Sequence, residues 1–357
     1  MKNTEVVLLT PGQLEIQRTS VPELKEDEVL IKVGYVGVCG SDIHGFMHGP
    51  FIPPKDPKQK ICLGHECAGT IVRVGAKAKK FQIGERVVVE PGVPCGRCKF
   101  CLSGHYNLCV DMDFLATSPN YRGALTNYLI HKESFTYKLP ETISMIEGAV
   151  IEPAAVGMHA AMEANIKPGK KVVILGAGCI GLMTLQACRM MGATEIVVCD
   201  VIEKRLAMAK KLGAMEVIHG KKEDILSCSK ELLGEWGADI VFETAGNQVT
   251  ASQTTKLVAR GGKILIVGTL SQEVAIDFLS INREVKIQTV FRYANNFPMT
   301  IEAIASGRID VKSMITDIYT YKEVQRAFEE AVSRKAEIIK SVIKIEDEEG
   351  DTDVSEY

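Results

Sequence analysis

The sequence has few aromatic residues, little net charge and no long hydrophobic run. Aromatic residues make up 6% of the 357 positions, and the formal net charge is −3. Such a charge provides no positive field for nucleic acid or for an anionic membrane surface. No apolar stretch approaches the roughly 18 residues that mark a membrane-spanning helix. We therefore expect neither a nucleic-acid partner nor a membrane partner, and a small molecule as the substrate.

The first residues also lack the features of a secretory signal peptide. The segment MKNTEVVLLTPGQLEI has no basic stretch followed by a long apolar core. The eleven cysteines are an odd number, which does not suit a complete disulfide framework. In a reducing compartment they would remain thiols or bind metal. We expect a cytoplasmic protein.

The pattern of hydrophobic residues changes near position 152, and the chain is long enough for two domains. Before this point, short alternating runs separated by glycine and proline predict a mainly-β region, with strands at 28–35, 69–74 and 86–90. After it, β-rich runs alternate with helical patterns, at 172–175, 196–198, 216–218, 240–243 and 263–267. This alternation predicts a parallel sheet covered by helices on both faces.

The expected fold class is therefore α/β, with a doubly wound domain at 153–291. Residues 292–345 carry two helical patterns and a final strand, which we expect to return to the first domain, 1–152. Residues 346–357 are acidic and nearly free of apolar side chains. That composition predicts a disordered tail.

One glycine-rich turn points to a dinucleotide cofactor. Gly176, Gly178 and Gly181 have G-x-G-x-x-G spacing, follow an apolar run and open a helical pattern. A helix N-terminus at such a turn suits a diphosphate. Asp200 ends the next β-rich run, where a carboxylate accepts hydrogen bonds from an adenosine ribose and repels a 2′-phosphate. This favours NAD over NADP, although the nearby Arg205 is a side chain that can hold the extra phosphate.

A cluster of cysteines predicts a structural metal site. Cys95, Cys98, Cys101 and Cys109 follow the spacing C-x2-C-x2-C-x7-C. Four thiolates on one loop can complete a tetrahedron around Zn²⁺ at about 2.3 Å per bond, which leaves no position for water or substrate. A zinc-ribbon module for nucleic acid is the alternative, but it needs a basic face, and the two basic residues of this loop do not supply one.

Three further segments carry residues able to bind metal or move protons: Cys39, Ser41 and His44 in the first, His65 and Glu66 in the second, and Glu152 in the third. No spacing rule joins residues so far apart in the sequence. Their joint role stays open at the level of the residues alone.

The motifs GHExAG, CGSDxH and GAGxxG, together with the four-cysteine loop, resemble those of the zinc-dependent medium-chain alcohol dehydrogenase superfamily. The resemblance covers almost the whole chain except the acidic tail. Within the superfamily the chain is most similar to the sorbitol (polyol) dehydrogenases, through IEP at 151–153, FLAT at 114–117, ETAGN at 243–247 and FRYAN at 291–295. The resemblance implies a Rossmann domain and a mainly-β, GroES-like catalytic domain.

The resemblance also implies roles for individual residues. Cys39, His65 and Glu66 would hold a catalytic zinc ion, with Glu152 beside it as a hydrogen-bonding partner or alternative ligand. Ser41 and His44 would carry the proton away, and Arg292 and Tyr293 would bind further substrate hydroxyls. The residues expected to contact NAD are Gly176, Gly178, Ile180, Gly181, Asp200, Arg205, Val267, Gly268, Thr269, Val290, Phe291 and Arg292.

The implied reaction is transfer of a hydride from a secondary hydroxyl of a polyol to NAD, giving a ketose. Alternatives are a butanediol or threonine dehydrogenase on the same scaffold, and a non-catalytic nucleotide- or zinc-binding protein. One segment departs from the family pattern: many sorbitol dehydrogenases have Tyr-Trp-Glu-His-Gly after the relay histidine, whereas residues 45–49 are Gly-Phe-Met-His-Gly. A homotetramer or homodimer is expected, because the β-rich run at 284–290 could pair across a subunit boundary.

Overall fold

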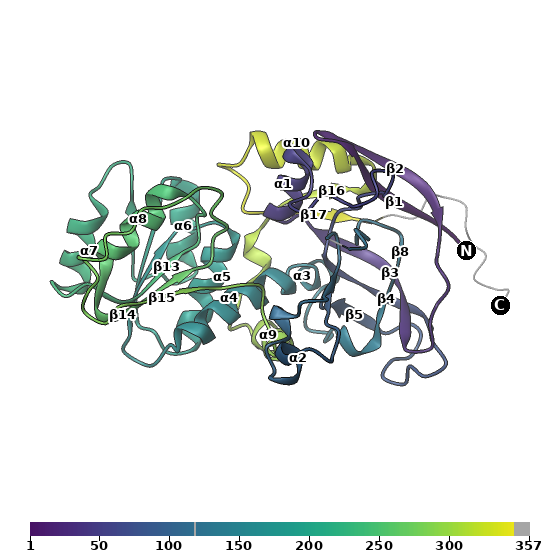
Figure 1. Cartoon of the computed structure of the whole chain (residues 1–357), viewed down its shortest axis with the longest axis horizontal. Helices are drawn as coiled ribbons and strands as arrows, with labels where there is room; N and C mark the ends of the chain where they lie inside the picture. The colour runs from purple at the N-terminus through teal and green to yellow at the C-terminus, as the bar shows by residue number, and fades with distance from the viewer. Residues whose placement is uncertain (118, 346–357) are drawn as a thin grey trace. The chain divides into compact units, whose positions relative to one another are not determined.

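The computed structural model describes residues 1–117 and 119–345, so the tail expected at 346–357 lies outside the described residues. The chain forms two compact units (Figure 1). The first unit contains Met1–Glu152 and the segment from Ile315 onward, and the second contains Pro153–Met314. The chain thus re-enters the first unit at Ile315, later than the position 292 suggested by the sequence.

The segment before Ile315 stays with the second unit because its polar groups bond there. The buried Asn296 donates a hydrogen bond from Nδ2 to the carbonyl oxygen of Ala155, at 2.8 Å. Asp310 donates its backbone N–H to Gln186 Oε1 at 2.6 Å. These bonds satisfy buried polar groups that would otherwise destabilise the fold.

The first unit is mainly β, as the sequence predicts. Its elements are β1 (Lys2–Thr10), β2 (Gln13–Ser20), β3 (Glu28–Gly37), α1 (Gly40–His48), β4 (Glu66–Val74), β5 (Arg86–Val89), β6 (Gly92–Val93), α2 (Lys99–Leu102), η1 (Tyr106–Leu108), β7 (Asp113–Phe114), β8 (Tyr128–Lys132), η2 (Glu133–Phe135), β9 (Thr136–Lys138), α3 (Met145–Gly148), β16 (Ile315–Thr320), η4 (Tyr321–Glu323), α10 (Val324–Ser333) and β17 (Lys340–Lys344). Its main sheet has the order β16-β17-β3-β4-β5-β9, and β8 also pairs with β3.

The C-terminal segment supports the first helix. In α10, Val324, Ala327, Phe328 and Ala331 are buried, at the spacing of one helical face. Phe328 packs on Phe46 of α1, with ring centroids 5.5 Å apart. The C-terminal part of the chain therefore holds in place the helix that follows Cys39.

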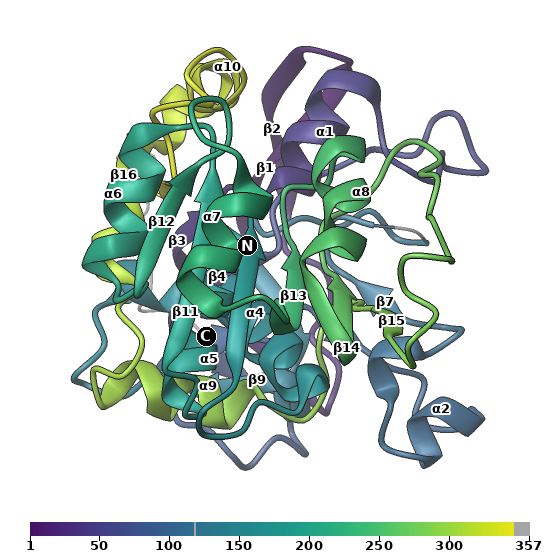
Figure 2. The same cartoon turned by 90° about the vertical axis from the view of Figure 1, so that its left-hand side faces the viewer.

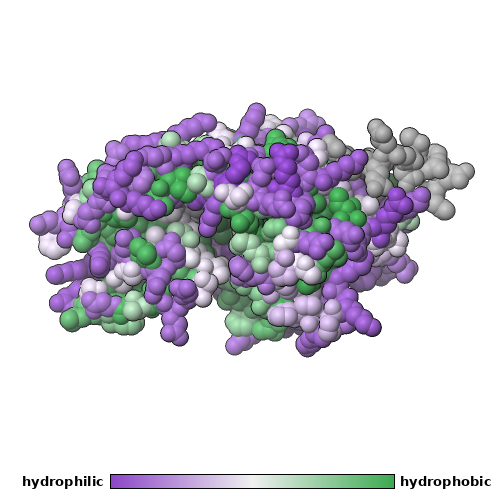
Figure 3. Space-filling view, turned by 90° about the horizontal axis from the view of Figure 1, so that it is seen from above, coloured by the Kyte–Doolittle hydropathy of each residue, from purple (hydrophilic) through white to green (hydrophobic). Residues whose placement is uncertain are grey.

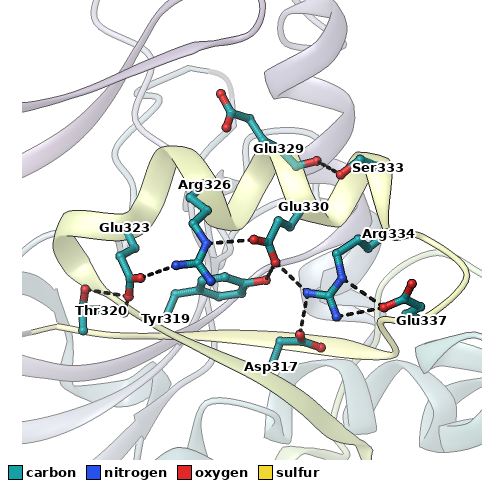
Figure 4. A network of polar contacts seen from close by, with 10 residues as sticks. All are labelled: Asp317, Tyr319, Thr320, Glu323, Arg326, Glu329, Glu330, Ser333, Arg334 and Glu337. Atoms are coloured by element: carbon teal, nitrogen blue, oxygen red, sulfur yellow. Dashed lines mark hydrogen bonds and ion pairs between the residues drawn. The ribbon is translucent and has the colours of Figure 1, made fainter.

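The opposite side of α10 carries a chain of charges (Figure 4). Glu330 accepts hydrogen bonds from Arg326 at 2.8 Å, from the Tyr319 hydroxyl at 2.8 Å and from Arg334 at 2.6 Å. The bond from Arg326, with those from Tyr319 and Arg334, lowers the pKa of Glu330 to about 2. Arg334 also reaches Asp317 on β16 at 3.1 Å, so the network ties the helix to the strand beneath it.

The second unit is a doubly wound α/β domain. Its elements are α4 (Ile151–Ala164, which begins at the unit boundary), β10 (Lys171–Leu175), α5 (Cys179–Met190), β11 (Glu195–Asp200), α6 (Glu203–Lys211), β12 (Glu216–His219), α7 (Ile225–Leu233), β13 (Ala238–Glu243), α8 (Gln248–Leu257), β14 (Val258–Ile266), β15 (Lys286–Thr289), α9 (Phe297–Ala305) and η3 (Lys312–Met314).

All strands of this sheet run parallel, in the order β12-β11-β10-β13-β14-β15. Helix α5 contacts α6, and α7 contacts α8, so that helices cover both faces (Figures 1 and 2). Double coverage explains why residues 172–175 are all apolar and fully buried rather than alternating. The strand order reverses between β10 and β13, where doubly wound sheets bind ligands. The predicted α/β fold class is confirmed.

No helix in residues 1–117 or 119–345 combines the length and apolar character needed to cross a membrane. Figure 3 shows hydrophilic side chains over much of one face, interrupted by separate hydrophobic patches. Exposed apolar side chains of this kind are common on folded proteins.

Candidate metal centre and dinucleotide site

Strand register brings the predicted metal ligands together. In the antiparallel pair of β3 and β4, Gly37 lies opposite Glu66. Cys39 follows two residues after Gly37 as the N-cap of α1, and His65 directly precedes Glu66. As a result, one ligand atom from each of Cys39, His65 and Glu66 lies within 4.8 Å of the others.

The absence of a side chain at Gly37 makes room for the carboxylate of Glu66. A Cβ atom at this position would lie 2.1 Å from Glu66 Oε2 and 3.0 Å from the carbonyl oxygen of Ala149. Directly opposed residues of an antiparallel pair have their side chains close together, so one of the two must be small here. Glycine at 37 thus determines where Glu66 can place its oxygens.

The carboxylate of Asp42 orients the imidazole ring of His65. This buried carboxylate accepts a hydrogen bond from the backbone N–H of Gly64 at 3.0 Å and from that of Cys39 at 3.2 Å. Its Oδ1 also lies 3.5 Å from His65 Nδ1. A carboxylate behind a histidine orients the ring so that the other nitrogen can bind metal.

Electrostatics at this point favour a bound cation. Burial opposes a charge on His65, but Asp42 and the Cys39 sulfur raise the pKa of His65 well above its usual value. Burial likewise opposes the charge of Asp42, yet His65 and two backbone N–H groups lower its pKa overall. The site therefore attracts a positive charge, either a proton or a metal ion.

A buried lysine shares Glu66 with the candidate centre. Lys340 of β17 forms an ion pair with Glu66 Oε2, and its Nζ donates to the carbonyl oxygen of Val38 at 3.0 Å. Lys340 is 3% exposed and Glu66 is 1% exposed. The Oε1 atom of Glu66 has no hydrogen-bond partner within the described part of the chain, so it remains available as a ligand.

The donor set fits zinc. A thiolate, an imidazole and a carboxylate are all common Zn²⁺ ligands, and three protein ligands leave one position open, as in catalytic zinc sites. The unpartnered oxygen of Glu66 supports this interpretation, because buried carboxylate oxygens are normally satisfied. The three residues would hold the ion, Asp42 would orient His65, and Lys340 would compete with the ion for the carboxylate of Glu66.

The other residues predicted around this centre lie in the same unit. Glu152 is buried in the first turn of α4. It does not belong to the group of ligand atoms formed by Cys39, His65 and Glu66 among the described residues. Ser41 is exposed in the first turn of α1, and His44 follows one turn later, half-buried.

The four cysteines of the lobe also converge. All four sulfur atoms lie within 4.8 Å of one another, with Cys98 and Cys101 3.4 Å apart. Backbone N–H groups lower the pKa of Cys98 to about 6, whereas burial and the neighbouring sulfurs raise that of Cys101 to about 12. Four thiolates crowded in this way need a cation to ionise together, as in a structural Zn²⁺ site.

A buried carboxylate anchors this lobe to the β-structure. Glu90, 1% exposed, accepts hydrogen bonds from the hydroxyls of Tyr106 in the lobe at 2.7 Å and of Tyr137 in β9 at 2.9 Å. Its carbonyl oxygen lies 2.9 Å from His131 Nε2. The short pair of β6 and β7 closes the base of the lobe, with Gly92 opposite Phe114.

The glycine turn of the second unit has the expected geometry. Gly176 has φ +105°, a left-handed conformation that favours glycine. A Cβ at Gly181 would lie 1.9 Å from the carbonyl oxygen of Gly176, so only glycine permits this approach of helix and strand. Gly178 is the N-cap of α5, with Ile180 in its first turn. This helix N-terminus can receive a phosphate group.

Asp200 uses much of its carboxylate within the turn. Its Oδ2 accepts from the N–H of Ala177 at 2.6 Å, and its Oδ1 accepts from Val201 at 2.7 Å and Ile202 at 3.0 Å. A carboxylate offers about four acceptor sites, so roughly one stays available for a ribose hydroxyl. Arg205 places Nη1 3.9 Å from the position of a Cβ on Gly178, beside the turn.

The remaining predicted contacts follow neighbouring strands of the same sheet. Val267, Gly268 and Thr269 come after β14, and Val290, Phe291 and Arg292 come after β15. Arg292 has φ +51° and stacks over Phe291, 4.9 Å from its centroid. Tyr293 is 4% exposed and packs near Phe297, with ring centroids 5.9 Å apart. The nucleotide candidates and the substrate candidates Arg292 and Tyr293 thus belong to the second unit, whereas the candidate metal centre and Glu152 belong to the first.

Sequence reasoning missed Asp42 and Lys340. Asp42 could have been noticed as an acidic residue three positions after Cys39, the spacing of a capping box. Lys340 could have been noticed as a charged residue beside the apolar stretch of a predicted buried strand. In both cases only the structure identifies the partner.

Comparison with known proteins gives a consistent result. Residues 25–141 match the family described as alcohol dehydrogenase GroES-like domain, and residues 179–306 match the family described as zinc-binding dehydrogenase. YdjJ of Escherichia coli K12, an uncharacterized zinc-type alcohol dehydrogenase-like protein, is 65% identical over 97% of this chain and 100% of its own. Sorbitol dehydrogenase of Bacillus subtilis 168 is 42% identical over 94% and 96%. The structure of 2R,3R-butanediol dehydrogenase of Bacillus subtilis aligns with a TM-score of 0.87 at 27% identity, over 96% and 99%.

Proposed function

The chain belongs to the zinc-dependent medium-chain alcohol dehydrogenase family, and from this premise we propose that it oxidises a secondary hydroxyl of a polyol with NAD, giving a ketose. The observation that carries the proposal is the convergence of Cys39, His65 and Glu66 at one buried point. The polyol is supported by the 42% identity to a sorbitol dehydrogenase and by the FRYAN sequence at 291–295.

Each residue near the metal centre then has a defined task. Cys39, His65 and Glu66 hold Zn²⁺, and Asp42 keeps the imidazole of His65 oriented. When bound, zinc lowers the pKa of a hydroxyl group and NAD accepts a hydride. Ser41 and His44 then carry the hydroxyl proton toward solvent, since Ser41 is exposed and the half-buried His44 lies one turn further along α1.

The second unit supplies the cofactor site. The turn at Gly176–Gly181 and the N-terminus of α5 bind the diphosphate, and the remaining acceptor site of Asp200 binds the adenosine ribose. The negative charge of Asp200 favours NAD because it repels the 2′-phosphate of NADP. Arg205 lies beside the turn and can hold such a phosphate, so NADP is tested directly. Arg292 and Tyr293 bind the distal hydroxyls of the substrate, and Glu152 lies beside the zinc ion as a hydrogen-bonding partner or alternative ligand.

A butanediol dehydrogenase is the second candidate, and the structural alignment to such an enzyme at a TM-score of 0.87 favours it. A panel assay separates the two. NADH formation is measured with sorbitol, xylitol, threitol, 2,3-butanediol and threonine, and each is repeated with NADP. Highest kcat/KM on a hexitol or pentitol supports the proposal, whereas a preference for butanediol or threonine overturns it.

Metal content tests the ligand assignment independently of substrate. About two zinc ions per chain are expected, and Glu66→Ala should retain the ion of the four-cysteine site while losing turnover. Cys39→Ser is a matched variant at the same centre. A Glu66→Ala protein with normal activity and two zinc ions would refute the assignment.

We also propose that the protein is a cytoplasmic homo-oligomer, a tetramer or a dimer. No disulfide joins the cysteines of residues 1–117 and 119–345, which suits a reducing compartment. Strand β15 ends the order of its sheet, so it has one edge available for pairing. Light scattering on the purified protein decides between a monomer and an oligomer.

A further inference from the structure

Two aromatic rings are stacked beside the helix that follows Cys39. The rings of His44 and Phe51 have centroids 3.8 Å apart and planes only 1° apart. His48 lies one helical turn after His44, with its ring 5.0 Å away and tilted by 57°. Gly49, at φ +83°, ends α1 and allows the chain to turn so that Phe51 covers the imidazole.

The loop that carries Phe51 is attached to a second segment of the same unit. The hydroxyl of Tyr121, a residue only 2% exposed, donates to the carbonyl oxygen of Ile52. Further along the loop, Gln59 Nε2 donates to the carbonyl oxygens of Pro119 at 2.9 Å and Asn120 at 3.1 Å. Phe51 is 59% exposed, yet its backbone surroundings are fixed by these bonds.

The charge state of His44 fits a proton carrier. Burial, with a smaller contribution from His48, lowers the pKa of His44. The nearest carboxylate on the same helix, Asp42, is directed to the backbone N–H groups of Cys39 and Gly64 and to His65. His44 is therefore neutral at pH 7 and able to accept a proton.

We propose that Phe51 is a positioning residue for His44, fixing the plane of the imidazole and keeping water from one of its faces. This inference rests on the proposed function, in which His44 carries the hydroxyl proton.

Histidine-labelled, zinc-loaded protein tests the stack by NMR without any substrate, and His44→Gln assigns the resonance. We expect an upfield ring-current shift of the His44 ring protons in the native protein and in Phe51→Tyr. Phe51→Leu should lose that shift, and its His44 titration midpoint should rise, because water reaches the ring. Ile52→Ala is the matched control: Ile52 is 64% exposed on the same loop and holds the loop through its backbone, so the His44 signal should not change.

Kinetics test the positioning role. With the best substrate of the panel, Phe51→Leu should lower kcat on the order of tenfold. This loss is part of the roughly 10²–10⁴-fold rate acceleration that a positioned acid–base group contributes. The KM of Phe51→Leu should change little, the acidic limb of its pH profile should move to higher pH, and Phe51→Tyr should restore the rate. An unchanged His44 signal in Phe51→Leu, or an unchanged kcat, overturns the inference. An intact ring-current shift with no active substrate refutes the proposed function alone and leaves Phe51 as the residue that orients His44.

Discussion

Replacing Lys340 by methionine should make the metal centre bind zinc more tightly, while destabilising the metal-free protein. Lys340 and Glu66 are 3% and 1% exposed, so each charge depends on the other in the absence of metal. Removing one partner of a buried ion pair costs about 3–5 kcal/mol, because the remaining charge is left without compensation. Methionine keeps an unbranched side chain of nearly the same length, but it lacks the charge and the hydrogen bond to the carbonyl oxygen of Val38.

Zinc compensates for that loss. A zinc ion bound by Glu66 gives the carboxylate a new positive partner. In the variant, the zinc ion also no longer experiences repulsion from the ammonium group of Lys340. If about 3 kcal/mol of the penalty disappears on metal binding, reciprocity requires the zinc affinity to rise by the same free energy, roughly 100-fold. The metal-free Lys340→Met protein should unfold at a clearly lower temperature, and saturation with zinc should restore most of the difference.

The assay is competition for zinc between the protein and a chromophoric chelator. Cys39→Ser provides the baseline, because only the four-cysteine cluster of Cys95, Cys98, Cys101 and Cys109 can then bind zinc tightly. Lys344→Met is the control for the strand, since Lys344 is an exposed lysine of β17 and surface substitutions usually change stability within about 0.5 kcal/mol. An affinity equal to or weaker than that of the native protein would show that Lys340 and the metal do not share Glu66.

Three further predictions concern Gly37, the four-cysteine lobe and the buried His131. Gly37→Ala puts a Cβ 2.1 Å from Glu66 Oε2, so elemental analysis should find about one zinc ion per chain instead of about two; two ions would contradict the packing argument. Cys98→Ser removes one of four thiolates, so the lobe should lose its ion and the melting temperature should fall by several degrees while the other zinc ion remains; retention of both ions would count against a structural site. Burial lowers the pKa of His131 to about 4 from the ordinary 6.5, so its stabilising contribution is complete above pH 6.5 and is lost as the pH falls toward 4. Denaturant titrations should show about 2 kcal/mol less stability at pH 5 than at pH 7 from this group, and His131→Gln should remove that part of the pH dependence.

Some of the molecule is encoded in contiguous segments, and these could be predicted. The strand, glycine turn and helix around Gly176–Gly181 form a local unit whose conformation depends on residues within one short segment. The four-cysteine lobe spans only residues 95–109, so loop closure brings its sulfurs together. The α/β class follows from hydrophobic periodicity, which also depends on neighbours in sequence.

The candidate metal centre could not be predicted in this way. Cys39 and Glu66 meet because β3 and β4 pair with Gly37 opposite Glu66, and a shift of one residue would turn every side chain of the strand to the other face. Without the resemblance to a family, nothing in the sequence specified this register. Lys340 lies still further away, since its contact with Glu66 depends on β17 returning to pair with β3.

The sequence by itself determined the two sites whose parts are neighbours along the chain, the glycine turn and the cysteine lobe. Only the tertiary structure decided that Glu66 is shared with a buried lysine, that Asp42 supports His65, and that Phe51 covers His44. The physical reason is that short-range patterns encode backbone conformation, whereas strand pairing and loop packing select which distant charges and rings come into contact.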